Sequence, residues 1–315
     1  MTGTATDAVA ARSSSHLLHA LAWMAGALVS FTLVAVAARE ASRQIDSLQI
    51  LLYRALISLA IIVSLAWASG QGFAPWRTKR LALHALRSSI HFIAQFNWLY
   101  ALTLIPLAQL FALEFTAPLW VALTAPLLLR ERMTATRLVA ALVGFAGTMI
   151  VVRPGAVGAN VGSTLALLAA LGFAVSMITT KQLTRTESAM TILFYMSAIQ
   201  TGLAAVISRG RMTIPDSITL FWVTLVGICG LTAHFSWVRA FALADAIIVA
   251  PMDFLRLPLI ALVGAWVYAE TLEPIVLLGG GVVVLANLIN LWGERRRGEQ
   301  RPARYRVCGT GGSGA

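Results

Sequence analysis

The chain of 315 residues is hydrophobic twice over, because five apolar spans are followed by five more and the second set resembles the first. When Trp98 is aligned with Trp237, Glu131 falls on Glu270, and most of the apolar positions between them also match. Each half holds an odd number of spans, so the two halves would cross a bilayer in opposite directions. The repeat therefore predicts an inverted duplication with its central site between the halves.

Composition places the duplication in a membrane. Hydrophobic residues make up 58% of the chain and charged residues only 12%, whereas ordinary globular domains carry about a quarter charged residues. Helices of roughly 20 apolar residues cross about 30 Å of hydrocarbon, and we place such spans at 17–38, 48–69, 82–102, 106–129, 136–153, 162–181, 190–208, 218–242, 246–269 and 275–292. The predicted fold is an all-α integral membrane protein with ten transmembrane helices as two inverted five-helix repeats.

This reading divides the chain into four parts. A cytoplasmic N-terminal segment, 1–16, precedes the first repeat, 17–153, and the second repeat, 162–292, is followed by a basic tail, 293–315. The first span is longer than the apolar region of a signal peptide, and its removal would break the five-plus-five symmetry, so we expect it to be retained.

The formal net charge of +11 is distributed by side of the membrane. With the N-terminus in the cytoplasm, 16 of the 24 Lys and Arg lie inside. Five lie outside: Arg39, Arg43, Arg153, Arg209 and Arg211. The other three lie within spans: Arg54, Arg87 and Arg256. This asymmetry fits the positive-inside rule with both termini in the cytoplasm of a cell whose inner membrane holds the protein. The basic tail then faces anionic lipid rather than nucleic acid.

Polar residues recur at membrane depth, where they are costly and usually line a cavity or meet a partner. Arg87, His91 and Gln95 follow one another every four residues, so they share one helical face that ends near Trp98. The repeat mate of this stripe carries His234 and Trp237. Hydrogen bonding between neighbouring helices is the alternative for any single residue, but the recurrence in both halves favours a lined cavity.

The fourth and ninth spans carry matched carboxylates, Glu114 and Asp253. Arg256 lies three residues after Asp253 on the same helical face, so an internal pair would ease the burial of both charges. Pro118 and Pro258 follow these charges, and each removes a backbone donor, which predicts kinked helices beside a cavity.

The stretches QFNWLYALTLIPLAQLFALEFTAPLWVALTAPLLLRERMT and PMDFLRLPLIALVGAWVYAET resemble the two repeat signatures of the drug/metabolite transporter superfamily, in its ten-helix EamA branch. The resemblance runs over residues 17–292. It implies a central cavity bordered by both repeats and a solute such as an amino acid, nucleotide, vitamin or drug. The positions that carry the motif are Glu114, Pro118, Glu131, Asp253, Arg256, Pro258 and Glu270.

These observations predict a secondary active transporter that moves a small organic metabolite by alternating access, with export preferred and uptake as the alternative. Glu114 and Asp253 would carry a proton or gate the cavity, and Arg256 would fix an anionic group of the solute. Trp98 and Trp237 would pack on the solute's apolar body.

Glu131 and Glu270 lie at helix ends, so we expect them to hold turns rather than contact solute. No metal or cofactor is expected, because no Cys/His metal spacing or nucleophile motif appears in the sequence. Proton coupling and a homodimer stay open. The rival classes are a membrane-embedded enzyme and a non-transporting membrane scaffold; a passive channel is disfavoured because no ring of repeated charges is readable.

Overall fold

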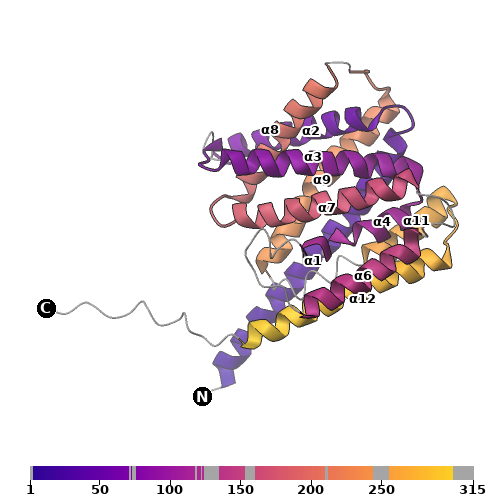
Figure 1. Cartoon of the computed structure of the whole chain (residues 1–315). Coiled ribbons are helices and arrows are strands. Elements are labelled where there is room, and N and C mark those ends of the chain that lie inside the picture. Colours follow the sequence, from indigo (N-terminus) through magenta and orange to yellow (C-terminus); the bar gives the residue numbers. More distant parts are fainter. Residues whose placement is uncertain are drawn as a thin grey trace.

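The computed structural model describes residues 3–70, 72, 76–117, 119–121, 123, 135–152, 160–209, 212–243 and 255–300. This part of the chain contains ten α-helices (Figure 1): α1 (Gly3–Ala41), α2 (Ser47–Ala68), α3 (Leu81–Leu104), α4 (Leu107–Glu114), α6 (Ala135–Val152), α7 (Val161–Leu183), α8 (Ala189–Ile207), α9 (Ser217–Leu243), α11 (Arg256–Tyr268) and α12 (Pro274–Gln300). Five of them, α1, α2, α7, α8 and α9, contain apolar stretches long enough to cross a membrane, and α4, α6, α11 and α12 contain shorter ones. The predicted all-α membrane fold of ten helices is confirmed.

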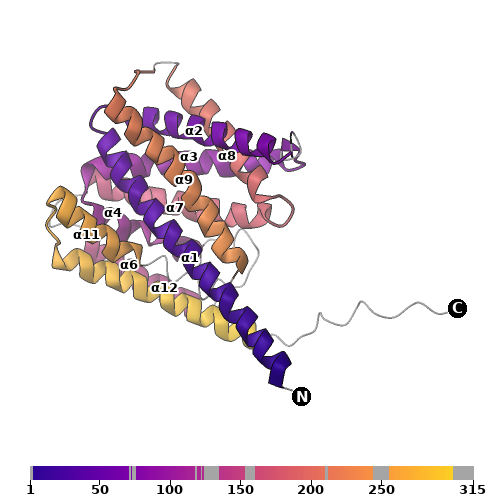
Figure 2. The same ribbon diagram turned by 180° about the vertical axis from the view of Figure 1, so that it is seen from behind.

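Most helices begin and end close to the predicted spans, and the differences are informative. Helix α1 begins at Gly3 and α12 reaches Gln300, so both run past the predicted bilayer segments, and the two extensions leave the bundle in the same general direction (Figure 2). Helix α4 stops at Glu114, in the middle of what the sequence predicts as one span. The described helix of the ninth span begins only at Arg256.

The main helix contacts of one half recur when the two halves are exchanged. Helix α1 packs on α9 as α7 packs on α3, and α2 contacts α9 as α8 contacts α3. The remaining mates contact each other directly: α2 with α8, α4 with α11, and α6 with α12. The two repeats are therefore interleaved around a pseudo-two-fold axis rather than folded as separate lobes, and the views from front and back agree (Figures 1 and 2).

Contacts between loops define one end of the bundle, which we call the Glu187 end. Thr78 Oγ1 donates to Glu187 Oε1 at 2.7 Å, and Arg80 Nη1 donates to the carbonyl of Gln182 at 3.3 Å. The start of α3 thus lies beside the end of α7, and the two helices run antiparallel.

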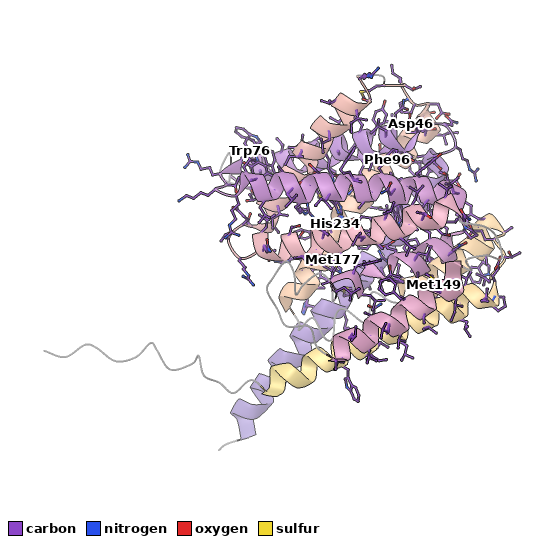
Figure 3. All side chains as sticks on the ribbon, in the orientation of Figure 1. Asp46, Trp76, Phe96, Met149, Met177 and His234 are labelled. Carbon is purple, nitrogen blue, oxygen red and sulfur yellow. The ribbon has the colours of Figure 1, made fainter. Side chains whose placement is uncertain are left out.

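The opposite end, the Glu270 end, gathers a different set of loops. Tyr53 donates through its hydroxyl to the carbonyl of Thr213 at 2.8 Å, and Gln49 donates to the Thr213 hydroxyl at 3.1 Å. Arg39, in the last turn of α1, pairs there with Glu270. Helix α1 therefore ends at the Glu270 end and its mate α7 ends at the Glu187 end, which is the inversion that the repeat predicts. Figure 3 labels one residue near each end: Asp46 near the Glu270 end and Trp76 near the Glu187 end.

Helix starts at both ends follow from capping side chains. The Asp46 carboxylate accepts from the amide of Gln49 at 2.9 Å, and Ser188 caps α8 in the same way through the amide of Thr191. Asp216 caps α9 by accepting from the amide of Thr219 at 2.8 Å. Hydrogen bonds from the side chain and the amide of Thr219 lower the pKa of Asp216 below its usual value, because they stabilise the carboxylate.

Small residues allow the closest helix approach, as is common between membrane helices. A Cβ atom on Gly147 of α6 would lie 2.8 Å from the carbonyl oxygen of Gly279 on α12, and one on Gly172 of α7 would lie 2.8 Å from Cβ of Ala94 on α3. Both contacts join one repeat to the other. Glycine is required at these points because the backbones leave no room for a side chain.

The two ends predict a topology that labelling can check. In a chain with Cys229→Ala and Cys308→Ala, a single cysteine at Lys79 should react with a membrane-impermeant maleimide only after cells are permeabilised, because the positive-inside rule puts the Glu187 end in the cytoplasm. A cysteine at Ile214, which is 90% exposed near the Glu270 end, should react in intact cells. The reverse pattern would contradict this orientation.

Candidate functional site

The early end of α4 places a carboxylate inside the bundle. After Glu114 the chain makes a turn in which the amide of Thr116 bonds to the carbonyl of Leu113, and the helix resumes with the amide of Leu119 on the carbonyl of Thr116. The carbonyl of Phe115 accepts from Asn287 Nδ2 at 2.8 Å. Pro118, which has no N–H to offer the preceding turn, lies outside the described residues. A side chain of α12 thus stabilises the break in α4.

Glu114 joins the two repeats through an ion pair. Its Oε1 lies 2.9 Å from Nη2 of Arg256 at the start of α11, and its Oε2 accepts from Nε1 of Trp98 at 2.7 Å. The Arg256 side chain is 6% exposed and that of Glu114 is 15% exposed. Asp253, the partner that the sequence predicts for Arg256, lies outside the described residues. The partner that the structure gives is contributed by the opposite repeat.

Aromatic rings surround the Arg256 guanidinium. Its Cζ lies 4.7 Å from the ring centroid of Phe31, 5.2 Å from that of Phe111 and 5.3 Å from that of Phe115. Such cation–π contacts stabilise a charge that has been withdrawn from water. Phe31 comes from α1 and the other two rings belong to the α4 segment, so the first repeat supplies the whole cage and the second repeat supplies the guanidinium.

The two histidines of the predicted stripe meet at the centre. The rings of His91 and His234 lie 5.7 Å apart, and His234 also packs edge-on against Phe31 at 5.6 Å. His91 Nδ1 lies 3.2 Å from the hydroxyl of Ser176 on α7. Figure 3 shows His234 in the middle of the bundle, away from both ends. Through Phe31 the histidine pair is continuous with the aromatic cage around Arg256.

The two tryptophans of the stripe are not brought together. Trp98 packs edge-on against Phe111 and belongs to the Glu114 network. Trp237, like Trp23 of α1, packs against a separate small cluster of Met24 and Ala240. Because the repeats are inverted, mates on α3 and α9 point toward opposite ends of the molecule, so a shared role in holding one solute is not supported by their positions.

Two further arginines are buried in the bundle: Arg87, which belongs to the predicted polar stripe, and Arg54, for which the sequence predicted no role. Arg54 of α2 donates through Nη1 to Gln95 Oε1 at 2.6 Å, and Arg87 of α3 donates through Nε to the hydroxyl of Thr180 at 3.0 Å. Arg54 is 6% exposed and Arg87 is 5% exposed. Their signal in the sequence is a full charge within an apolar span, which is itself a pointer to function.

Glu270 stabilises the end of the bundle rather than the centre. Its Oε1 pairs with Arg39, and its Oε2 accepts from the amide of Leu107 at 2.9 Å, which caps the N-terminus of α4. Arg39 donates in turn to the carbonyls of Leu102 and Ile105 at 2.8 Å. This arrangement supports the holding role predicted for Glu270, although it acts on α4 and α1 rather than on its own following turn.

Of the other motif residues, the structure describes Pro258 only. Pro258 occupies the first turn of α11, where a missing N–H costs no hydrogen bond and no kink is needed. Glu131, like Pro118, lies outside the described residues. Among the residues that the structure does describe, no group of three or more His, Cys, Asp or Glu side chains gathers as a metal site.

Comparison with known proteins shows the family to which the chain belongs. Residues 18–153 match the model of the EamA-like transporter family. A riboflavin transporter of Vibrio cholerae is 31% identical over 91% of this chain and 97% of its own length. The chain belongs to the EamA-like transporter family. It is therefore a multi-pass membrane protein that transports a small molecule, and not an enzyme.

Further EamA relatives differ in what they carry. An S-adenosylmethionine uptake transporter of Rickettsia prowazekii is 25% identical over 89% of this chain and 94% of its own. A pseudopaline exporter of Pseudomonas aeruginosa is 25% identical over 82% of this chain and 92% of its own. A solved crystal structure shares the fold with a TM-score of 0.61 at 16% identity, over 90% of this chain and 99% of that one.

The Glu270 cluster generates a prediction about stability. Glu270→Gln and Arg39→Gln should each lower the free energy of unfolding by about 2 kcal/mol, because either leaves a partly buried charge without its partner. The double variant should cost little more than either single one, which gives a coupling energy of about 1–2 kcal/mol. Denaturation of purified protein in detergent measures all three.

The exposed Arg185, at the Glu187 end, supplies a control for Arg39→Gln. Arg185→Gln removes the same charge and should change stability by less than about 0.5 kcal/mol, as expected for a surface substitution. Additive costs for Arg39→Gln and Glu270→Gln would show that the pair contributes nothing beyond its separate contacts.

Proposed function

We propose that the chain is a secondary active transporter that moves a small, flat heteroaromatic metabolite across the cytoplasmic membrane by alternating access. The observation that carries this proposal is the ion pair between Glu114 and Arg256, which links the two inverted repeats inside an aromatic cage. Inverted repeats place solute sites at the repeat interface near the midplane. A charge pair at that interface can respond both to bound solute and to protonation, and its formation depends on how the two repeats are arranged.

The pair supports a switching role because its two partners belong to different repeats. Rocking of one repeat against the other must shorten or lengthen the distance between Glu114 and Arg256, whereas contacts within a repeat travel with it. Protonation of Glu114 removes the charge that holds Arg256, so it weakens the link and favours the conformation in which the two are apart. A proton gradient could then drive the cycle.

The aromatic surroundings support the class of solute. Phe31, Phe111 and Trp98 lie around the ion pair, and the rings of His91 and His234 extend the aromatic surface. Flat rings stack on such surfaces with favourable offset or edge geometry. The relatives named for riboflavin and S-adenosylmethionine carry compounds that contain fused heteroaromatic rings, in agreement with this assignment.

Uptake is the direction that we propose, which reverses the preference for export drawn from sequence. The relatives whose names state both a heteroaromatic solute and a direction are uptake transporters. Export is the second candidate, and the pseudopaline exporter supports it. We place the protein in the inner membrane with both termini in the cytoplasm, as the distribution of Lys and Arg favours.

Reconstitution tests the solute class. Purified protein in liposomes should take up radiolabelled riboflavin or S-adenosylmethionine at a rate at least about tenfold above empty liposomes, with stimulation by an inward proton gradient. An excess of unlabelled flat heteroaromatic compound should compete, and an aliphatic amino acid should not. Transport of aliphatic solutes alone would overturn the proposed class, and accumulation only in inside-out vesicles would favour export.

Glu114→Gln separates binding from coupling. The amide keeps the shape of the protonated carboxyl, so this variant should still exchange labelled for unlabelled solute within about threefold of the wild-type rate, but it should not concentrate solute on a pH gradient. Glu40→Gln, at the end of α1, removes a carboxylate outside the centre and should leave both activities unchanged.

Arg256 gives the reciprocal result. Arg256→Ala should abolish transport, and Arg256→Lys should recover part of it, because a point charge replaces a planar guanidinium that both pairs and stacks. If Glu114→Gln still concentrates solute with an unchanged pH dependence, Glu114 is not the proton carrier, and Asp253, His91 or His234 would be the next to test.

A further inference from the structure

A second cluster of positive charge lies in the bundle, on α2 and α3 rather than on α11. Arg54 and Arg87 are both buried, and the hydrogen bonds that they make go to neutral partners, Gln95 and Thr180. A guanidinium carries five donors, so one neutral acceptor satisfies only part of each group. Neither bond neutralises a charge.

The charges of this cluster act on one another. The guanidinium groups of Arg54 and Arg87 lie within range of each other's charge, and His91 and His234 lie within range of both. Within the described part of the chain, no carboxylate is among the groups that act on these four side chains. The cluster is therefore a concentration of one sign of charge at the centre of a membrane protein.

Two polar atoms of the cluster have no hydrogen-bond partner within the described residues. Arg87 Nη1 and His91 Nε2 are buried and have no hydrogen-bond partner there, although the residues are only 5% and 6% exposed. On α9, a Cβ atom at Gly230 would lie 3.0 Å from Arg54 Nε. Glycine at this position therefore lets the Arg54 guanidinium lie close to α9.

A buried charge without a counter-charge is among the most expensive arrangements in a protein. Interhelical hydrogen bonding alone does not account for it, because a neutral side chain could donate to Gln95 and Thr180 at far lower cost. We propose that Arg54 and Arg87, with His91, bind an anionic group between α2, α3 and α9. That group is a carboxylate or phosphate of the transported solute, or a free inorganic anion. Arg256, to which the sequence analysis gave this role, already has Glu114 as a partner.

Anion binding is testable without any transport assay. Purified wild-type protein, in chloride-free buffer with a bulky sulfonate, should gain roughly 3 °C or more in melting temperature on addition of saturating chloride, inorganic phosphate or acetate. Arg54→Gln and Arg87→Gln should each lower the affinity for the stabilising anion at least about tenfold, because each removes a charged donor. Arg87→Lys should keep part of the response.

Arg77 supplies the matched control, since it is an exposed arginine at the Glu187 end. Arg77→Gln lowers the net charge by the same amount and should respond to anions as the wild type does. Should a glutamine variant fail to fold, the wild-type titration and the Arg87→Lys variant still decide the question. A wild type whose melting temperature no anion raises, or glutamine variants that respond like the wild type, would overturn the proposal.

Riboflavin and flavin mononucleotide separate the two sources of the anion, because they differ by one phosphate. If the anion belongs to the solute, flavin mononucleotide should raise the melting temperature more than riboflavin does in chloride-free buffer, and Arg87→Gln should remove the difference. If a free anion fills the site, transport of neutral riboflavin should require chloride or phosphate. This second measurement rests on the proposed function, whereas the melting titration does not: a protein that binds anions but carries no heteroaromatic solute would contradict the proposed function alone.

Discussion

The pair of Glu114 and Arg256 places two charges where the bilayer offers no water, and each is tolerable only because the other is present. Since the partners come from different repeats, the charges tie the halves together more specifically than apolar packing can. Membrane helices gain little from hydrophobic burial against one another, because lipid is as apolar as leucine. Hydrogen bonds and ion pairs across the pseudo-two-fold axis therefore carry much of the orientation of one repeat on the other.

The symmetry of the backbone is broken by the side chains at the axis. Ala117 occupies the position in the first repeat that Arg256 occupies in the second, so the mirror image of the Glu114 ion pair cannot form. A backbone with two equivalent halves can adopt two equivalent, inverted conformations, but a single ion pair makes them differ in energy. Protons or solute acting on that one pair can then shift the balance between them.

Sequence was sufficient for what depends on local pattern and length. The ten helices, their approximate limits and the inversion all follow from the apolar runs and from the odd number of spans in each half. The end of α4 at Glu114 did not follow, because the carbonyl of Phe115, directly after the helix, accepts from Asn287 on a helix that is distant in the chain. Spacing alone pointed to Asp253 as the partner of Arg256, whereas contact between α4 and α11 brings in Glu114.

Taken together, the two charge clusters imply a link between protons and anions. In the described residues the centre holds Arg54, Arg87 and Arg256 against the single carboxylate of Glu114. Protonation of Glu114 leaves this centre more positive, so an anionic group in the site would bind more tightly to the protonated protein. By reciprocity, a bound anion would favour protonation by the same free energy. A solute that carries its own negative charge would then bring a proton with it, and both would cross together when the repeats exchange conformations.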